Sequence, residues 1–207
     1  PGWVVDAFYE HGSLGMRKDG GEAFTEHQIH LLERFTEVFA LGYRRHLDLL
    51  AAEERARQAE LARARQHVRT VVSGMEKAED IERVVAVLQT ELQSLDVDFD
   101  YVGINIVNET ETAFRRSWTS SAAGQVDASE VSSGEPETGT NMGALIDAWR
   151  SGEPWLRERS VDLADQPGWV VDVPFDFGTL AMNRLQHDAK TFDKADIDVL
   201  NGFSDVM

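Results

Sequence analysis

The sequence predicts an α+β fold, in which antiparallel strand pairs are combined with helices, one of them unusually long. Three observations carry this prediction. A strand–turn–strand–helix pattern occurs twice, near the two ends of the 207-residue chain. Residues 25–73 contain no proline and a single glycine, Gly42, so a long helix is expected there. Between residues 101 and 120, apolar and polar side chains alternate as they do in half-buried strands.

An internal repeat defines the expected domain organisation. The hexapeptide PGWVVD occurs at residues 1–6 and again at 167–172, and the continuing similarity gives 14 identities over 39 aligned positions. Repeated sequence of this kind indicates repeated structure. We therefore expect residues 1–40 to be the C-terminal part of one domain, 41–75 a helical connector, and 76–207 a complete second copy. The chain is accordingly expected to be a piece of a longer protein.

Each repeat is predicted to form a β-hairpin followed by a helix. In the second copy, residues 169–175 and 179–184 read as strands, and Gly178 between them favours a turn. The helix that follows has apolar residues at helical spacing. It begins at Thr191 or Asp193, since either side chain is a good N-cap.

The first copy carries its own helix start signal. Thr25 is a suitable N-cap, and Gln28, three residues later, completes the pattern of a capping box. The stretch 51–66 consists almost entirely of strong helix formers. The helix that begins at the first repeat is therefore expected to run on through the connector.

Apolar residues of this long helix recur at alternating steps of three and four, which is the spacing of a coiled coil. We therefore expect a parallel homodimer through residues 30–75. A single solvated helix is the alternative, because Glu54 and Arg57 stand where a coiled coil needs apolar residues. Two seams can be drawn: Leu32, Phe35, Phe39, Gly42, His46 and Leu49, and Leu47, Leu50, Glu54, Arg57, Leu61, Ala64, Val68, Val71 and Met75.

The complete copy contains further elements ahead of its hairpin. Periodicity and turn residues predict the order helix, two strands, long loop, helix and short strand. These elements are expected over 78–94, 101–108, 112–120, 121–140, 141–150 and 154–159. The loop over 121–140 is rich in Ser, Gly and acidic residues, and its length makes a functional or disordered segment the expectation.

Several local motifs accompany this order of elements. They are Ala148-Trp149, Gly152-Glu153-Pro154, Val173-Pro174-Phe175, Gly178 and the stretch from Phe192 to Leu200. Together, the order and the motifs resemble the GAF family of small-molecule sensor domains. The resemblance covers residues 76–207 and, as the tail of a preceding copy, residues 1–40; the similar PAS fold fits less well.

The resemblance implies a six-stranded antiparallel sheet with helices on both faces and a ligand pocket on one of them. GAF domains in tandem are commonly found upstream of histidine kinases, cyclases or phosphatases. The expected function is a non-enzymatic sensory module of a bacterial-type signalling protein, which binds a small molecule and relays a change through a dimeric helix. The alternative is a ligand-free GAF domain that serves only to dimerise the chain.

Composition and motif content limit the partners and the kinds of site that are expected. The chain carries 37 acidic and 20 basic residues, a formal net charge of −17, which repels nucleic acid and anionic lipid. No apolar run is long enough to span a membrane, and a cytoplasmic location is expected. There is no cysteine, no nucleotide-binding or hydrolase motif, and no catalytic or metal site is assigned. His27 and His30 are taken as part of a solvated helix face, and no cofactor is specified.

Strand alternation gives a candidate ligand site. Val102, Ile104 and Ile106 are expected to face the helical core, so Asn105 faces the other way. Arg116 would receive an anionic or carbonyl group of a small planar ligand. In the alternative interpretation, Arg116 simply pairs with an aspartate and the tryptophans fill the core. The complete candidate set is Asn105, Arg116, Trp118, Trp155 and Asp172.

Overall fold

The protein consists of two compact units, Pro1–Ala59 and Glu60–Met207. Their boundary lies within the predicted connector, and a single helix contributes to both. The expected α+β class and the long helix are confirmed. The structure is a computed structural model, and it describes residues 2–77, 80–108, 114–121, 124, 126–132, 141–158, 168–185 and 190–207.

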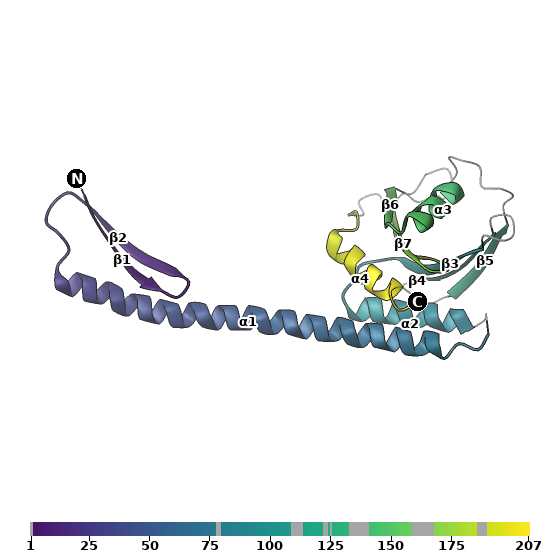
Figure 1. Ribbon diagram of the computed structural model, residues 1–207, viewed down its shortest axis with the longest axis horizontal. Helices are drawn as coiled ribbons and strands as arrows, with labels where there is room; N and C mark the ends of the chain where they lie inside the picture. The colour runs from purple at the N-terminus through teal and green to yellow at the C-terminus, as the bar shows by residue number, and fades with distance from the viewer. Residues whose placement is uncertain are drawn as a thin grey trace. The chain divides into compact units, whose positions relative to one another are not determined.

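The first unit is a β-hairpin followed by the start of a long helix (Figure 1). Strands β1 (Gly2–Tyr9) and β2 (Gly12–Asp19) pair antiparallel, and helix α1 spans Glu26–Ser73. The predicted capping box opens this helix. The Gln28 amide donates to Thr25 Oγ1 at 3.3 Å, and the Thr25 amide donates to Gln28 Oε1 at 3.0 Å.

An aromatic cluster holds this hairpin on its helix. The ring of Tyr9 contacts those of Phe39 and Tyr43 edge to face, at centroid distances of 5.5 and 6.1 Å. Arg44 forms an ion pair of 2.9 Å with Glu10, beside the same contact. Because few other side chains of the first unit are buried, these contacts are central to its cohesion.

The second unit is built on a six-stranded sheet in which all described pairs are antiparallel. The strand order is β5-β4-β3-β8-β7-β6. The first and last strands of this unit along the chain, β3 and β8, are therefore neighbours at the centre of the sheet. The strands are β3 (Tyr101–Asn108), β4 (Phe114–Ser121), β5 (Val126–Ser132), β6 (Trp155–Glu158), β7 (Gly168–Phe175) and β8 (Gly178–Leu185).

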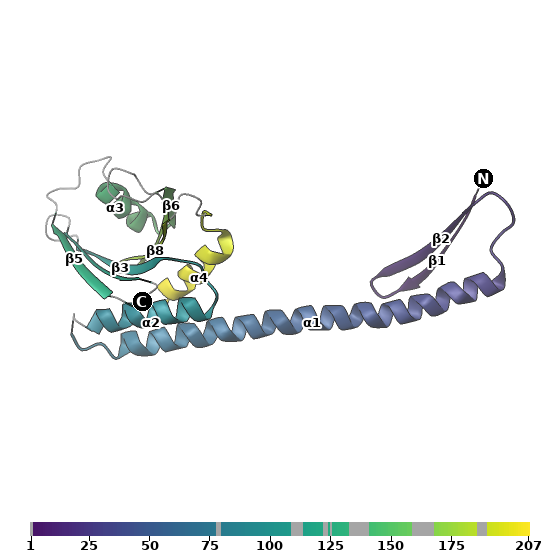
Figure 2. The ribbon, with the colours of Figure 1, turned by 180° about the vertical axis from the view of Figure 1, so that it is seen from behind.

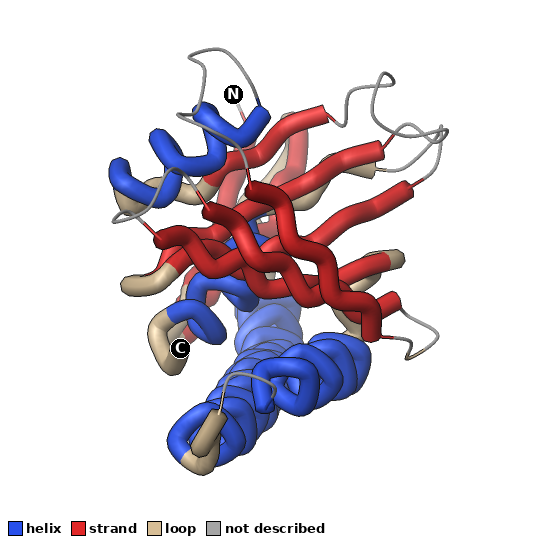
Figure 3. The backbone as a smooth tube through the Cα atoms, turned by 90° about the vertical axis from the view of Figure 1, so that its right-hand side faces the viewer, coloured by secondary structure: helices blue, strands red, loops and turns tan. Residues whose placement is uncertain are grey.

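Helices cover both faces of this sheet (Figures 2 and 3). The end of α1 runs beside α2 (Ile81–Ser94), and both lie with α4 (Lys194–Ser204) on one face. Helix α3 (Asn141–Ser151) lies on the other face. Asp193 is the N-cap of α4 and forms a capping box with Asp196, which is one of the two starts that the sequence allowed.

The main hydrophobic core lies between the sheet and the face covered by α1, α2 and α4. The predicted strand alternation is confirmed, because Val102 and Ile104 are fully buried in this core and Ile106 packs against it. The apolar stripe of α2 is buried in the same place, and consists of Ile81, Val84, Val85, Leu88 and Leu92.

Part of the predicted dimer seam is used inside the chain instead. Ala64, Val68 and Val71 are buried in the core of their own domain, packed with α2 and the sheet. Their spacing suits either partner, since a helix packed on α2 and a helix in a coiled coil both bury one narrow apolar stripe. The prediction that these residues form an intermolecular seam is therefore wrong.

Strand β5 (Val126–Ser132) was predicted as part of a loop over 121–140. The segment pairs with β4 along its length, from Val126 opposite Ser120 to Ser132 opposite Phe114. It is an edge strand, so a polar sequence is tolerated and backbone hydrogen bonds to β4 define it. Residues 133–140 of the predicted loop lie outside the described residues.

A buried carboxylate fastens the end of α1 to α2. The side chain of Glu91 is 5% exposed and accepts hydrogen bonds from Arg63 Nη2 at 2.8 Å and from His67 Nδ1 at 2.7 Å. Burial acts to raise the pKa of Glu91, but the hydrogen bonds from His67 and Arg63 outweigh it, so the pKa lies below its ordinary value. The ionised carboxylate therefore contributes to stability.

This contribution predicts a loss of stability in acid. The folded pKa of Glu91 lies below its unfolded value of about 4.3, so stabilisation is complete above that pH and is lost as the pH falls through the folded pKa. Glu91→Gln should cost about 1–2 kcal/mol at pH 7 and flatten the decline below pH 4.5. Urea unfolding from pH 7 to 3 measures both, with exposed Glu82→Gln as the control. Equal acid slopes for the wild type and Glu91→Gln would contradict the prediction.

Candidate functional site

A buried polar cluster lies on the sheet face opposite the main core. Asp172 of β7 is 1% exposed, and its Oδ1 accepts hydrogen bonds from Asn105 Nδ2 at 3.1 Å and Thr179 Oγ1 at 2.8 Å. Asn105 Nδ2 also donates to Thr179 Oγ1 at 3.0 Å. Three strands thus contribute one polar side chain each to a single hydrogen-bonded group.

Arg157 of β6 completes the cluster. Its Nη1 forms an ion pair with Asp172 Oδ2, and its guanidinium carbon lies 3.8 Å from the centroid of the Trp155 ring. The Arg157 side chain is 22% exposed, whereas Asp172 is almost fully buried. The cluster therefore contains one partly accessible cation, the Arg157 guanidinium, which is held in place by the Asp172 carboxylate and the Trp155 ring.

Strand register brings these residues together. Asn105 lies opposite Thr179 across β3 and β8, and Trp155 lies opposite Asp172 across β6 and β7. Directly opposed residues of antiparallel strands share a face, and residues two apart along a strand do so as well. Arg157 therefore joins Trp155 on the face that carries Asp172.

Helix α3 packs over this face of the sheet. The indole Nε1 of Trp149 donates to the Phe175 carbonyl of β7 at 2.8 Å, and Leu145 and Ile146 of the helix are buried. Gly152 ends the helix with a φ of +72°, a left-handed conformation that glycine adopts without strain. The predicted turn Gly152-Glu153-Pro154 thus leads from α3 directly into β6 and the cluster.

The structure brings together three of the five predicted site residues: Asn105, Trp155 and Asp172. The side chains of Arg116 and Trp118 lie outside the described residues. Their backbone positions are described, and the register pairs Arg116 with Ile106 and Trp118 with Ile104. The residue of β4 opposite Asn105 is Ser117.

Two cluster residues were missed from the sequence, Arg157 and Thr179. Alternation along Trp155-Leu156-Arg157 already places Arg157 on the face of Trp155, so strand β6 carried a usable signal. Thr179 had a weaker one: it follows Gly178, which was expected in the turn but is the first residue of β8, and only the pairing of β8 with β3 places it beside Asn105.

The cluster can bind and orient an acceptor group, but it lacks the parts of the familiar catalytic sites. One partly exposed cation, one buried carboxylate and two hydrogen-bonding side chains are present, with no activated nucleophile among the described residues of the cluster. Within the same part of the chain, no group of three His, Asp or Glu side chains is placed to hold a metal ion. His30 hydrogen-bonds Glu33 at 2.9 Å on the exposed helix surface.

Comparison with known proteins gives no family for this chain. No family model and no curated protein sequence matches it. None of the helices in the described ranges is both long enough and apolar enough to cross a membrane. A comparison within the molecule is informative: Asp6, which repeats Asp172, is exposed in the first unit, so the buried cluster is a property of the second unit.

Proposed function

We propose that the second unit is a GAF-type sensory module that binds a small molecule on the α3 side of its sheet. The observation that carries the proposal is the fixed, partly exposed guanidinium of Arg157 beside the ring of Trp155. Support also comes from the antiparallel sheet with helices on both faces and from the GAF-like motifs around Trp149, Gly152 and Gly178.

The ligand is small and planar and carries a carboxylate or carbonyl group. An arginine has five N–H donors in a rigid fork, and the ion pair with Asp172 Oδ2 uses Nη1 alone. The ring of Trp155 supplies an aromatic surface next to that fork. Arg157 thus takes the role that the sequence suggested for Arg116.

The signal travels through the helices that enter and leave the domain. Binding on one sheet face shifts β6 and its neighbour β7, and β7 contributes Val171 and Val173 to the core that also contains residues of α1 and α4. In this proposal α1 dimerises over residues 30–60, where Leu49 and Leu50 are about half exposed. The module acts in the cytoplasm, next to a separate output domain. Light scattering of the full chain at high micromolar concentration should give twice the monomer mass, and a monomer would contradict the dimer.

A second candidate function is a ligand-free structural module that only dimerises. One observation favours it: both carboxylate oxygens of Asp172 are already bonded within the protein, to Asn105, Thr179 and Arg157. A cluster whose members satisfy one another can serve to fix the register of β3, β8, β7 and β6 without any ligand.

A thermal-shift screen with the full chain separates the two functions. The library contains cyclic nucleotides and aromatic acids, and a ligand at a hundred times its Kd should add about 2.7 kcal/mol of stability. Arg157→Lys keeps a cation beside Asp172 but removes the planar fork, so it should abolish the shift. The matched control is Arg83→Lys on exposed α2 surface, which should retain it.

Two results would decide against ligand binding at this site. One is the absence of any shift across the library, which favours the structural module. The other is an undiminished shift in Arg157→Lys, which would mean that the ligand binds elsewhere on the molecule.

A further inference from the structure

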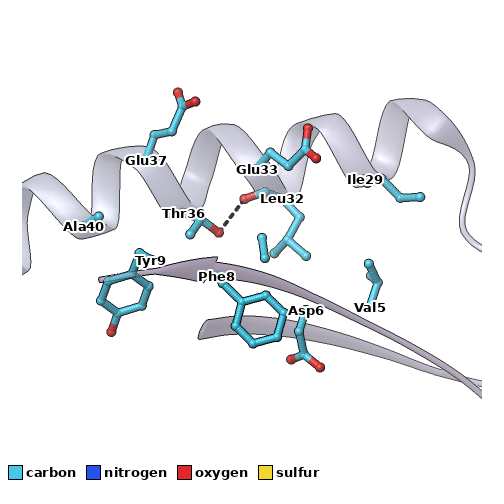
Figure 4. Close-up of a pocket in the computed structure, with 11 residues that line it drawn as sticks. Val5, Asp6, Phe8, Tyr9, Ile29, Leu32, Glu33, Thr36, Glu37 and Ala40 are labelled. Atoms are coloured by element: carbon cyan, nitrogen blue, oxygen red, sulfur yellow. Dashed lines mark hydrogen bonds between the residues drawn. The ribbon is translucent and has the colours of Figure 1, made fainter. Parts of the chain in front are cut away.

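The hairpin and helix of the first unit repeat β7, β8 and α4 of the second unit. In its described residues, the first unit lacks the further strands and helices that pack around these elements in the second unit. Strands β1 and β2 pair in the register of β7 and β8, since Asp6 lies opposite Gly15 as Asp172 lies opposite Ala181. Between hairpin and helix there is a cavity of about 510 Å³, lined mainly by apolar residues (Figure 4). In the second unit, the corresponding side of the hairpin packs against α4 and lies in the core to which α2 and the end of α1 also contribute.

Matched side chains differ sharply in exposure between the two copies. Val4 is 66% exposed and its counterpart Val170 only 6%; Phe35 is 61% exposed and its counterpart Phe203 is fully buried. Asp6 and Phe8 point away from the helix, on the hairpin face that α3 covers in the second unit (Figures 3 and 4). Exposed apolar side chains that recur at core positions of a second copy indicate a missing partner rather than a solvent surface.

Gly12 gives an independent indication that a strand belongs beside β2. Its counterpart Gly178 must be glycine, because a Cβ there would lie 1.8 Å from the Asn105 carbonyl oxygen of the adjacent β3. At Gly12 the nearest atom to a Cβ is the Tyr9 hydroxyl at 3.3 Å, and neither glycine has a positive φ. Within residues 2–59 nothing requires this glycine, whereas an approaching strand would.

We propose that the first unit is the docking surface for one occupant: a segment built like residues 60–158, carried on the same polypeptide ahead of Pro1. Such a segment would add a β3-like strand along β2 and a β6-like strand along β1. Apolar side chains of its two helices would fill the 510 Å³ cavity. An α3-like helix would cover Val4 and Phe8, which are exposed in the first unit. This inference rests on the internal repeat and is independent of the proposed ligand.

The chain itself supplies the material for a test. Fusing an extra copy of residues 60–166 ahead of Pro1 recreates the natural junction, because PGWVVD follows in both places. Hydrogen exchange of amides 7–19, a stretch of unique sequence, should slow by about two orders of magnitude or more in the fusion. Exchange at 168–185 should not change.

Gly12→Val is the matched control. In the unfused chain it should leave exchange of residues 7–19 unchanged, since only the Tyr9 side chain has to give way. In the fusion it should remove most of the gain, because the valine would block the added strand. The same substitution at Gly178 in the second unit should be strongly destabilising.

Two outcomes would overturn the proposal. The first is a folded fusion in which amides 7–19 exchange as fast as in the original chain. The second needs no fusion: if the original chain already protects residues 7–19 as well as 168–185, and protection falls on dilution, a second copy covers the surface.

Discussion

Replacing Asp172 by alanine should lower the free energy of unfolding of the second unit by about 3–5 kcal/mol. The carboxylate is almost completely buried and neutralises Arg157 while accepting hydrogen bonds from Asn105 and Thr179. Alanine leaves a cation and two donors facing each other in a desolvated site. Urea unfolding followed by tryptophan fluorescence reports this loss, because four of the five tryptophans lie in the second unit.

The repeat supplies the control for this substitution. Asp6 occupies the same register position in β1 but is exposed, so Asp6→Ala should change stability by no more than about 0.5 kcal/mol. The loss of unfolding free energy for Asp172→Asn should lie between those for Asp172→Ala and Asp6→Ala, since asparagine keeps the shape but removes the charge that balances Arg157. A cost below 1 kcal/mol for Asp172→Ala would mean that the cluster stabilises the domain little.

Short-range patterns in the sequence were sufficient to predict most of the helices and strands. Alternation in Val102-Gly103-Ile104-Asn105 assigned each residue to a face, because the pleat of a strand has a period of two. The capping residue Thr25 marked the start of α1, and Asp193, one of the two N-caps that the sequence allowed, marks the start of α4. Such signals depend only on neighbouring backbone groups, so they are readable without knowledge of the fold.

The partner of Asp172 depended on strand order, which the sequence does not express locally. Two arginines, Arg116 and Arg157, were each on a strand that could have adjoined β7. In the sheet, β6 is the neighbour of β7, whereas β3 and β8 separate β7 from β4. Arg157 is therefore within reach of Asp172, and the choice of arginine follows from topology rather than from residue type.

The helical seam shows a second limit of local patterns. Ala64, Val68 and Val71 recur at steps of three and four, and this spacing is satisfied equally by a partner chain or by α2 of the same chain. Strand β5 illustrates the opposite case, in which the sequence pattern is weak. Its assignment comes from pairing with β4, a contact between segments that hydrophobic periodicity cannot reveal.

Phe203→Ala should be as damaging as the loss of Asp172, for a different reason. The ring of Phe203 in α4 is fully buried in the main core, between the sheet and the helices α1 and α2. Truncation removes its transfer free energy and leaves a cavity, with a combined cost of about 3–5 kcal/mol. Urea unfolding by fluorescence should therefore show a lower midpoint with an unchanged slope, which is the signature of a destabilised but intact native state.

Phe35→Ala tests whether burial rather than residue type sets this cost. Phe35 occupies the repeated position at the start of α1 but is 61% exposed, so its truncation should cost less than about 1 kcal/mol. Because the two phenylalanines share helix position and neighbouring sequence, a difference of several-fold isolates the effect of the surrounding core. In the chain extended with a second copy of residues 60–166, Phe35→Ala should become nearly as costly as Phe203→Ala. Equal, small costs for both substitutions in the original chain would show that α4 is not packed as described.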